Sequence, residues 1–128
     1  MIYLDTHVVA WLNIGRGREI PESVRRLIEQ EDVLISPMVE LELEYMFEIG
    51  RAASPARDVV ARMADMVGLQ VCHEPFSEVV KSSVKQDWTR DPFDRIIVGH
   101  AALRQRPLVT KDRLIRKHYP HAHWSDSA

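Results

Sequence analysis

Short apolar runs alternate along the chain with longer segments in which apolar residues recur at helical spacing. The short runs are rich in Val, Ile and Leu and predict strands at residues 1–4, 33–36, 69–72, 107–110 and, at the edge, 121–124. The longer segments predict helices at residues 21–30, 37–51, 54–68, 76–86, 91–106 and 111–119. Short strands separated by helices indicate an α/β fold, with a parallel sheet covered on both faces.

The size and composition of the chain fit one domain, residues 1–128, because 45% of its residues are hydrophobic. A net charge of −2 excludes a polycation that binds nucleic acid through bulk charge alone. The charge is uneven, since residues 1–64 carry 7 basic and 11 acidic groups and residues 65–128 carry 10 and 8. We therefore expect a polyanion to meet the second half of the chain.

Cys72 is the only cysteine, which excludes an intrachain disulfide and is typical of a reducing compartment. The first residues, MIYLDTH, contain neither the apolar stretch of a signal peptide nor that of a membrane span. We expect a cytoplasmic protein that does not enter a membrane.

Several acidic residues stand at predicted helix starts. Asp5 directly follows the first strand, and Asp112 opens the last helix. Aspartate is a favoured N-cap, so capping alone explains either residue. In a parallel sheet, however, the ends of the strands and the first turns of the following helices are also where ligands bind.

The segment DPFD at residues 91–94 resembles a capping box, with Asp91 as the N-cap and Pro92 in the first turn. Capping explains Asp91 better than Asp94. Asp94 shares a predicted helix face with the apolar residues Ile97, Val98 and Ala101, so we expect its side chain to lean toward the core.

Glu42 is the one glutamate of the 37–51 helix that falls within an apolar stripe. We assign that stripe to Met38, Val39, Tyr45, Met46 and Ile49, and a solvated face to Glu40, Glu44 and Glu48. A carboxylate in an apolar stripe is costly unless it is paired. A buried ion pair, a position at the edge of the stripe and a functional site remain open as explanations of Glu42.

Together, Asp5, Glu42, Asp94 and Asp112 are predicted to converge at one edge of the sheet. Four neighbouring carboxylates cannot all stay ionised unaided, so either their pKa values rise or a cation lies among them. All-oxygen ligands favour Mg²⁺ or Mn²⁺, which act on phosphates. The nearby cations could hold a nucleic-acid backbone: Arg90, Arg95, Lys111 and Arg113.

Four strings resemble, in order, the motifs of the PIN-domain ribonucleases, and most closely the VapC-type toxins of toxin–antitoxin pairs. These strings are MIYLDTHVVAWL, ISPMVELELEYM, DPFDRIIVGHA and LVTKD, and the resemblance spans nearly the whole chain. It places the motif acids on Asp5, Glu42, Asp94 and Asp112. The family's fold is a three-layer α/β/α sandwich with a short, mainly parallel sheet.

The resemblance implies an endoribonuclease that cleaves RNA with Mg²⁺ or Mn²⁺ held by those four acids. Thr6, Asp91 and Thr110 are the possible supporting residues of that site. A cognate antitoxin protein and a homodimer are the implied partners. The chain departs from the commoner motifs at His7 and in VGHA, residues 98–101, without losing a required acid.

Other classes of protein fit less well. A receiver domain needs paired acids before its phospho-accepting aspartate, and a haloacid-dehalogenase-like phosphatase needs an acid at position 7, where this chain has His7. A PIN nuclease of RNA processing outside toxin systems stays open as an alternative. So does a catalytically silent PIN-like module that binds RNA.

Overall fold

A computed structural model of the chain describes residues 1–125, and all eleven segments predicted as strands or helices form within it. The strands are β1 (Ile2–Leu4), β2 (Val33–Ile35), β3 (Gln70–Val71), β4 (Leu108–Val109) and β5 (Ala122–His123). The helices are α1 (Thr6–Asn13), α2 (Glu22–Gln30), α3 (Pro37–Glu48), α4 (Ala56–Val67), α5 (Phe76–Val84), α6 (Pro92–Leu103) and α7 (Arg113–His118), with a short 3₁₀ helix, η1 (Gly17–Glu19).

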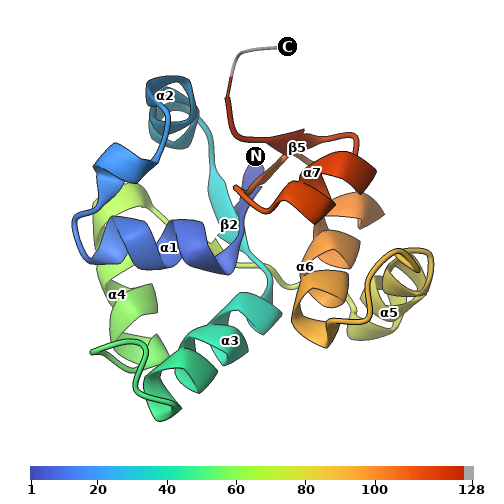
Figure 1. Cartoon of the computed structure of the whole chain (residues 1–128), viewed down its shortest axis with the longest axis horizontal. Helices are drawn as coiled ribbons and strands as arrows, with labels where there is room; N and C mark the ends of the chain where they lie inside the picture. The colour runs from blue at the N-terminus through green and yellow to red at the C-terminus, as the bar shows by residue number, and fades with distance from the viewer. Residues whose placement is uncertain (126–128) are drawn as a thin grey trace.

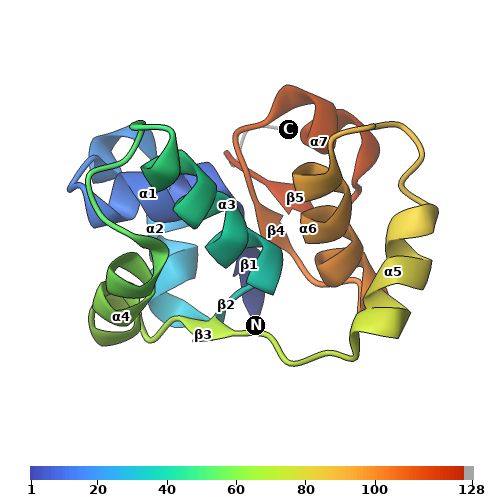
Figure 2. The same ribbon diagram turned by 90° about the horizontal axis from the view of Figure 1, so that it is seen from below.

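The sheet is parallel at every pairing and has the strand order β3-β2-β1-β4-β5. Figures 1 and 2 show α1, α2 and α4 on one side of the sheet and α5 and α6 on the other. This arrangement confirms the predicted α/β/α sandwich. The chain proceeds outward from β1 to β3 and then returns to the other side of β1, so the winding reverses between β1 and β4. Ligands of such sheets bind at this reversal, beyond the carboxyl ends of the strands.

The two central strands form the middle of the core. Ile2, Leu4, Leu108 and Val109 are fully buried, as expected for strands covered on both faces. Their register pairs Leu4 with Val109, so β1 and β4 end side by side. Whatever follows these two strands is therefore brought together. Within residues 1–125, no helix is both long and apolar enough to cross a membrane.

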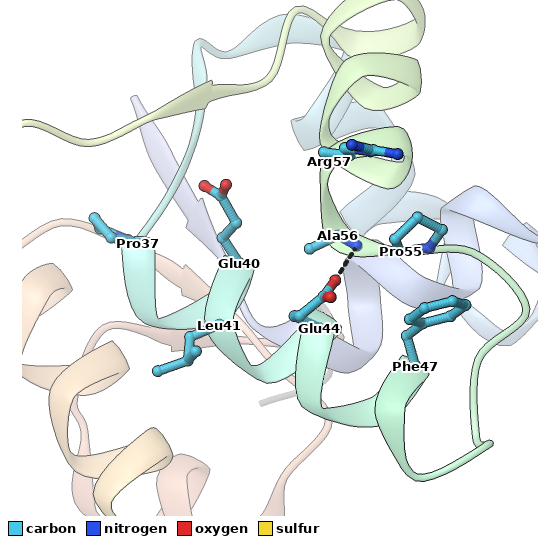
Figure 3. A pocket seen from close by; sticks show the side chains of 8 residues that line it. All are labelled: Pro37, Glu40, Leu41, Glu44, Phe47, Pro55, Ala56 and Arg57. Atoms are coloured by element: carbon cyan, nitrogen blue, oxygen red, sulfur yellow. Dashed lines mark hydrogen bonds between the residues drawn. The ribbon is translucent and has the colours of Figure 1, made fainter.

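Helix α4 begins without a side-chain cap from its own N-cap residue. That residue is Pro55, which has no side-chain group to accept a hydrogen bond. Instead the backbone N–H of Ala56 donates to Glu44 Oε1 on α3, at 2.9 Å (Figure 3). The expectation that Glu44 lies only on a solvated face was therefore wrong. Gly68 ends α4 in the left-handed conformation, which glycine adopts readily.

The apolar stripe that we assigned to α3 was also partly wrong. Val39 and Leu43 are its buried residues, whereas Tyr45 and Ile49 are 49% and 46% exposed. The residues that face the core follow a line four residues apart, and only tertiary contacts decide which line is buried. Glu42 is half-buried beside this line, and its partner is described below.

Helices α5 and α6 pack closely at Gly99. A Cβ atom added at this glycine would lie 3.0 Å from Ser83 Cα and closer still to the Ser83 side chain. Because a backbone atom is in the way, a side-chain rotation cannot relieve the clash. Gly99, which departs from the commoner family pattern, therefore allows the close approach of the two helices.

We expect Gly99→Ala to destabilise the fold. Overpacking costs about 1–3 kcal/mol, which offsets the gain of up to about 1 kcal/mol that alanine brings to a helix. Urea unfolding should show a lower free energy of unfolding than the parent. Gly17→Ala is the matched control, since nothing lies within 4 Å of its added Cβ. Equal losses for the two variants would contradict this account of the packing.

Candidate active site

The acids predicted at helix starts meet in one cleft of about 420 Å³. It lies at the carboxyl ends of β1 and β4, where the winding of the sheet reverses. Its walls are formed by eight side chains: Asp5, His7, Trp11, Glu42, Asp91, Asp94, Lys111 and Asp112. The cleft thus contains all four predicted metal-binding acids. A larger cavity of about 810 Å³ between α3 and α4 lacks this convergence of acids (Figure 3).

Asp5 is the most deeply placed acid and is only 5% exposed. One oxygen caps α1 by accepting from the N–H of Thr6 at 2.8 Å, and the other accepts from Thr110 Oγ1 at 2.6 Å. Burial raises the pKa of the Asp5 carboxyl, while the hydrogen bond from Thr110 opposes that rise. Asp5 therefore both caps a helix and presents a carboxyl to the cleft.

Glu42 reaches the cleft from the second turn of α3. Thr6 Oγ1, which is fully buried, donates a hydrogen bond to Glu42 Oε1. Burial raises the pKa of Glu42, the bond from Thr6 lowers it, and the charge of Asp5 raises it again. No arginine pairs with Glu42 in residues 1–125, so the buried ion pair considered from the sequence is not formed.

The two aspartates of α6 have different roles at its start. Asp91 is the N-cap, and its Oδ1 accepts from the N–H groups of Phe93 and Asp94 at 2.9 and 3.4 Å. The N–H of Asp91 donates to Thr89 Oγ1, at 3.2 Å, rather than to the Asp94 carboxyl. In a capping box the side chain at position 94 would accept this bond, and Thr89 takes that place here. The Asp94 side chain is left to face the cleft.

The Asp94 carboxyl is half-buried and faces several other acids. Burial, followed by the charges of Asp5, Asp91 and Asp112, raises its pKa to about 7. The predicted inward lean of Asp94 agrees with the complete burial of Ile97 and Val98 on the same helix. Four neighbouring carboxyls therefore oppose the ionisation of Asp94, those of Asp5, Asp91, Asp112 and Glu42.

Asp112 is the exposed acid of the group. It caps α7, with Oδ1 accepting from the N–H of Ile115 at 2.9 Å, and its own N–H donates to Thr110 Oγ1 at 3.0 Å. Thr110 thus connects Asp112 to the buried Asp5 carboxyl. Both threonines expected as supporting residues form hydrogen bonds with two of the acids, Thr6 with Asp5 and Glu42, and Thr110 with Asp5 and Asp112.

Only one of the four predicted basic residues lines the cleft. Lys111 does so, with Nζ 5.6 Å from the centre of the Trp11 ring. Arg95 donates instead to the carbonyls of Ser83 and Val84 at the end of α5, at 2.9 and 3.1 Å, and Arg90 donates to the Asp87 carbonyl at 2.8 Å. Arg113 lines a separate cavity on α7.

Sequence reasoning missed Trp11 and gave His7 no role in the site. Both are on α1 and line the cleft, four residues apart on one face, with ring centres 6.2 Å apart. The helical spacing from Asp5 was the signal available, because residues 7 and 11 follow the first acid by half a turn and a turn and a half.

The donors suit a hard divalent cation, since they are carboxylate oxygens whose mutual repulsion a cation would relieve. Within residues 1–125, however, no three His, Cys, Asp or Glu side chains are grouped so that they could hold a metal ion as they stand. Three of the acids are engaged by other groups, Asp5 by Thr6 and Thr110, Glu42 by Thr6, and Asp112 by a backbone N–H. The chemistry of the donors fits a metal, and binding would require side-chain rotation.

Comparisons with known proteins support the fold and identify the family. Residues 2–119 match the model of the PIN domain. One chain of VapBC2 from Rickettsia felis, solved bound to a DNA fragment from their promoter, has a TM-score of 0.63 and 17% identity, with 98% of this chain and 100% of that chain covered. One chain of DNA-bound VapBC from Salmonella typhimurium has a TM-score of 0.62 and 20% identity, with 95% and 94% covered. No curated protein matches the chain.

We expect the metal-free protein to lose stability as pH rises through neutrality. A carboxyl whose pKa is higher in the folded than in the unfolded state favours folding while it is protonated. For Asp94, whose pKa rises from 3.8 to about 7, that contribution is complete below about pH 4 and is lost as pH passes 7. Unfolding in urea with EDTA, between pH 4 and 8, measures it.

Asp94→Asn should show a flatter pH profile than the parent, because the amide does not ionise. Asp58→Asn, on the exposed start of α4, is the control and should leave the profile unchanged. Indistinguishable profiles for the parent and Asp94→Asn would show that the cleft does not oppose ionisation of this carboxyl.

Proposed function

The chain belongs to the PIN domain family, and from this premise we propose that its acidic cleft is the active site of a metal-dependent endoribonuclease. The observation that carries the proposal is the convergence of Asp5, Glu42, Asp94 and Asp112 in one cleft at the reversal of the sheet. These four acids come from segments as far apart as residues 5 and 112. Neither Glu42 nor Asp94 caps a helix, so capping does not explain why these two acids lie in the cleft.

Mg²⁺ or Mn²⁺ is the cofactor of the proposal, with Asp5, Glu42, Asp94 and Asp112 as its ligands. When bound, such an ion activates water and neutralises charge that develops on a phosphate. The chain's own residues fix the carboxyls in place. Thr110 and the N–H of Thr6 orient Asp5, and Thr6 Oγ1 orients Glu42.

Asp94 is the acid that we assign to the attacking water. Its carboxyl makes no side-chain hydrogen bond within residues 1–125, so its oxygens can accept hydrogen bonds from a water in the cleft. Lys111 lies at the wall of the same cleft and could contact a substrate phosphate. Asp91, whose oxygen is used in capping, is the acid that should tolerate neutral replacement.

The toxin role is the finer part of the proposal. The two similar structures are named as VapBC, and both were solved with DNA. We infer that this chain is the toxin of a VapBC-like pair, inhibited by a cognate antitoxin protein, and that it acts in the cytoplasm. A PIN nuclease of RNA processing and a silent RNA-binding module are the alternatives.

A homodimer is also part of the proposal. Apolar side chains are exposed along neighbouring surfaces of α3, α5 and α6, and two cavities there share Ile96 as a wall. Phe76 and Val84 on α5 are each 64% exposed, and Leu41 on α3 is 57% exposed. A second copy would cover this surface. Light scattering of the purified chain distinguishes a dimer from a monomer.

We expect purified protein to cleave RNA with Mg²⁺ or Mn²⁺, and EDTA to abolish cleavage. Asp94→Asn should lower the cleavage rate by roughly 100-fold or more, because a positioned carboxylate contributes at least that much. Asp91→Asn is the matched control on the same helix, since asparagine caps as well as aspartate. Gel assays of a labelled RNA measure both. Equal activity of parent and folded Asp94→Asn would exclude the proposed site.

For the toxin role, we expect induction of the chain alone to arrest growth of a bacterial host. Asp94→Asn, induced to the same level, should not arrest growth, because the arrest depends on cleavage. Co-induction of the neighbouring reading frame should restore growth if that frame encodes the antitoxin. Normal growth with an active parent enzyme would favour the alternative of a nuclease outside toxin systems.

A further inference from the structure

A basic cavity of about 440 Å³ lies on α7 and β5, next to the acidic cleft. Its walls are Arg113, Arg116, Lys117, Ala122, Trp124 and Ser125. Figure 1 shows α7 and β5 side by side in the last part of the chain that the structure describes. The three cations are exposed, and residues 113–125 include no aspartate or glutamate. This cavity therefore carries a concentrated positive charge on a protein whose net charge is negative.

The cations of this cavity are available to a ligand. None of the ion pairs within residues 1–125 involves Arg113, Arg116 or Lys117. Other arginines are engaged by protein groups: Arg104 binds both oxygens of Glu74 at 3.2 Å, and Arg95 donates to two carbonyls of α5. Within the part of the chain that the structure describes, no acid therefore pairs with the cations of α7, whereas Arg104 and Arg95 are held by other protein groups.

Two tryptophans and a lysine join the basic cavity to the acidic cleft. Trp124, in the wall of the basic cavity, lies with its ring centre 5.8 Å from that of Trp11, in the wall of the cleft. Lys111 Nζ lies over the Trp11 ring at 5.6 Å. Because residues 111, 112 and 113 are consecutive, the chain passes directly from the cleft to the basic cavity. The two hollows are therefore neighbours, with the two tryptophan rings in contact between them, and we refer to them together as the path.

This path has the chemistry that a single-stranded nucleic acid requires. Phosphates need cations, and bases stack on accessible aromatic faces, of which the half-buried Trp124 ring offers a part. The acidic cleft itself repels a polyanion, so a substrate held only there would bind poorly. Cations beside the cleft would offset that repulsion without pairing with the acids themselves.

We propose that the α7 cavity, with Arg113, Arg116 and Lys117, binds backbone phosphates of the RNA beside the bond that is cut. Trp124 lines the path so that a base next to those phosphates can stack on it. The inference rests on the proposed nuclease function, since it places the flanking part of the same substrate. It assigns to α7 the positioning of RNA, and none of its three cations contacts the reacting atoms.

The experiment measures RNA binding in EDTA, where no cleavage occurs. Fluorescence anisotropy of a labelled single-stranded RNA of mixed sequence gives the dissociation constant. It is measured between roughly 50 and 200 mM salt, the range over which phosphate contacts weaken. Arg116→Ala with Lys117→Ala should weaken binding about 10-fold and lower the salt slope by about 1 to 1.5, since each single-strand phosphate contact contributes about 0.7.

The matched control is Arg57→Ala with Arg62→Ala, which removes the same charge from exposed positions on α4. Figures 1 and 2 both show α4 apart from α7. This control should keep both the affinity and the salt slope of the parent. The exchange Arg116→Lys with Lys117→Arg keeps the charge and should also bind like the parent. Circular dichroism of each variant verifies that it is folded.

The outcomes separate this inference from the proposed function. Loss of affinity in the α7 variant alone supports the inference, whether or not the parent cleaves RNA with Mg²⁺. Equal losses in the α7 and α4 variants, or no loss in either, would overturn it. A parent that cleaves RNA while its α7 variant binds normally would preserve the nuclease and reject the basic cavity. A parent that does not bind RNA rejects the inference outright.

Discussion

The hydrogen bond from Thr110 to the buried Asp5 carboxyl is the interaction on which the site depends. It joins the residues that follow β1 and β4, the strands between which the winding of the sheet reverses. The Asp5 N–H also donates to the Val109 carbonyl at 3.0 Å, so backbone and side chain hold the same junction. A carboxyl that is only 5% exposed requires such partners, because an unpaired buried charge is costly. The other acids are arranged around this fixed one.

Helix capping and a role in the cleft do not exclude each other here. Asp5, Asp91 and Asp112 each cap a helix through an oxygen and also line the cleft. In a parallel sheet the helices start next to the ends of the strands, so caps and ligands occupy the same edge. Only Asp94 has its capping task taken over, by Thr89 at the N–H of Asp91. The acid relieved of a structural bond is the one that we assign to the water.

Electrostatics divide the surface around the site into two regions. Burial raises the pKa values of Asp5, Glu42 and Asp94, and the carboxyls gathered in the cleft raise that of Asp94 further. Cations gathered on α7 border the cleft on one side, with the Trp11 and Trp124 rings between the two regions. A polyanionic substrate with a cation at its reacting phosphate would match both regions at once.

The sequence alone determined the order of strands and helices and the identity of the acids. Apolar runs and helical spacing predicted the five strands of residues 1–125 and the helices α2 to α7, because each signal is local, and the motif strings pointed to Asp5, Glu42, Asp94 and Asp112. Tertiary structure decided which line of α3 is buried, that Glu44 caps α4, and that Arg95 turns away from the cleft. It also placed Trp11 beside Trp124, more than a hundred residues later. These outcomes depend on contacts between distant segments, and local spacing carries no information about which distant segment a side chain will meet.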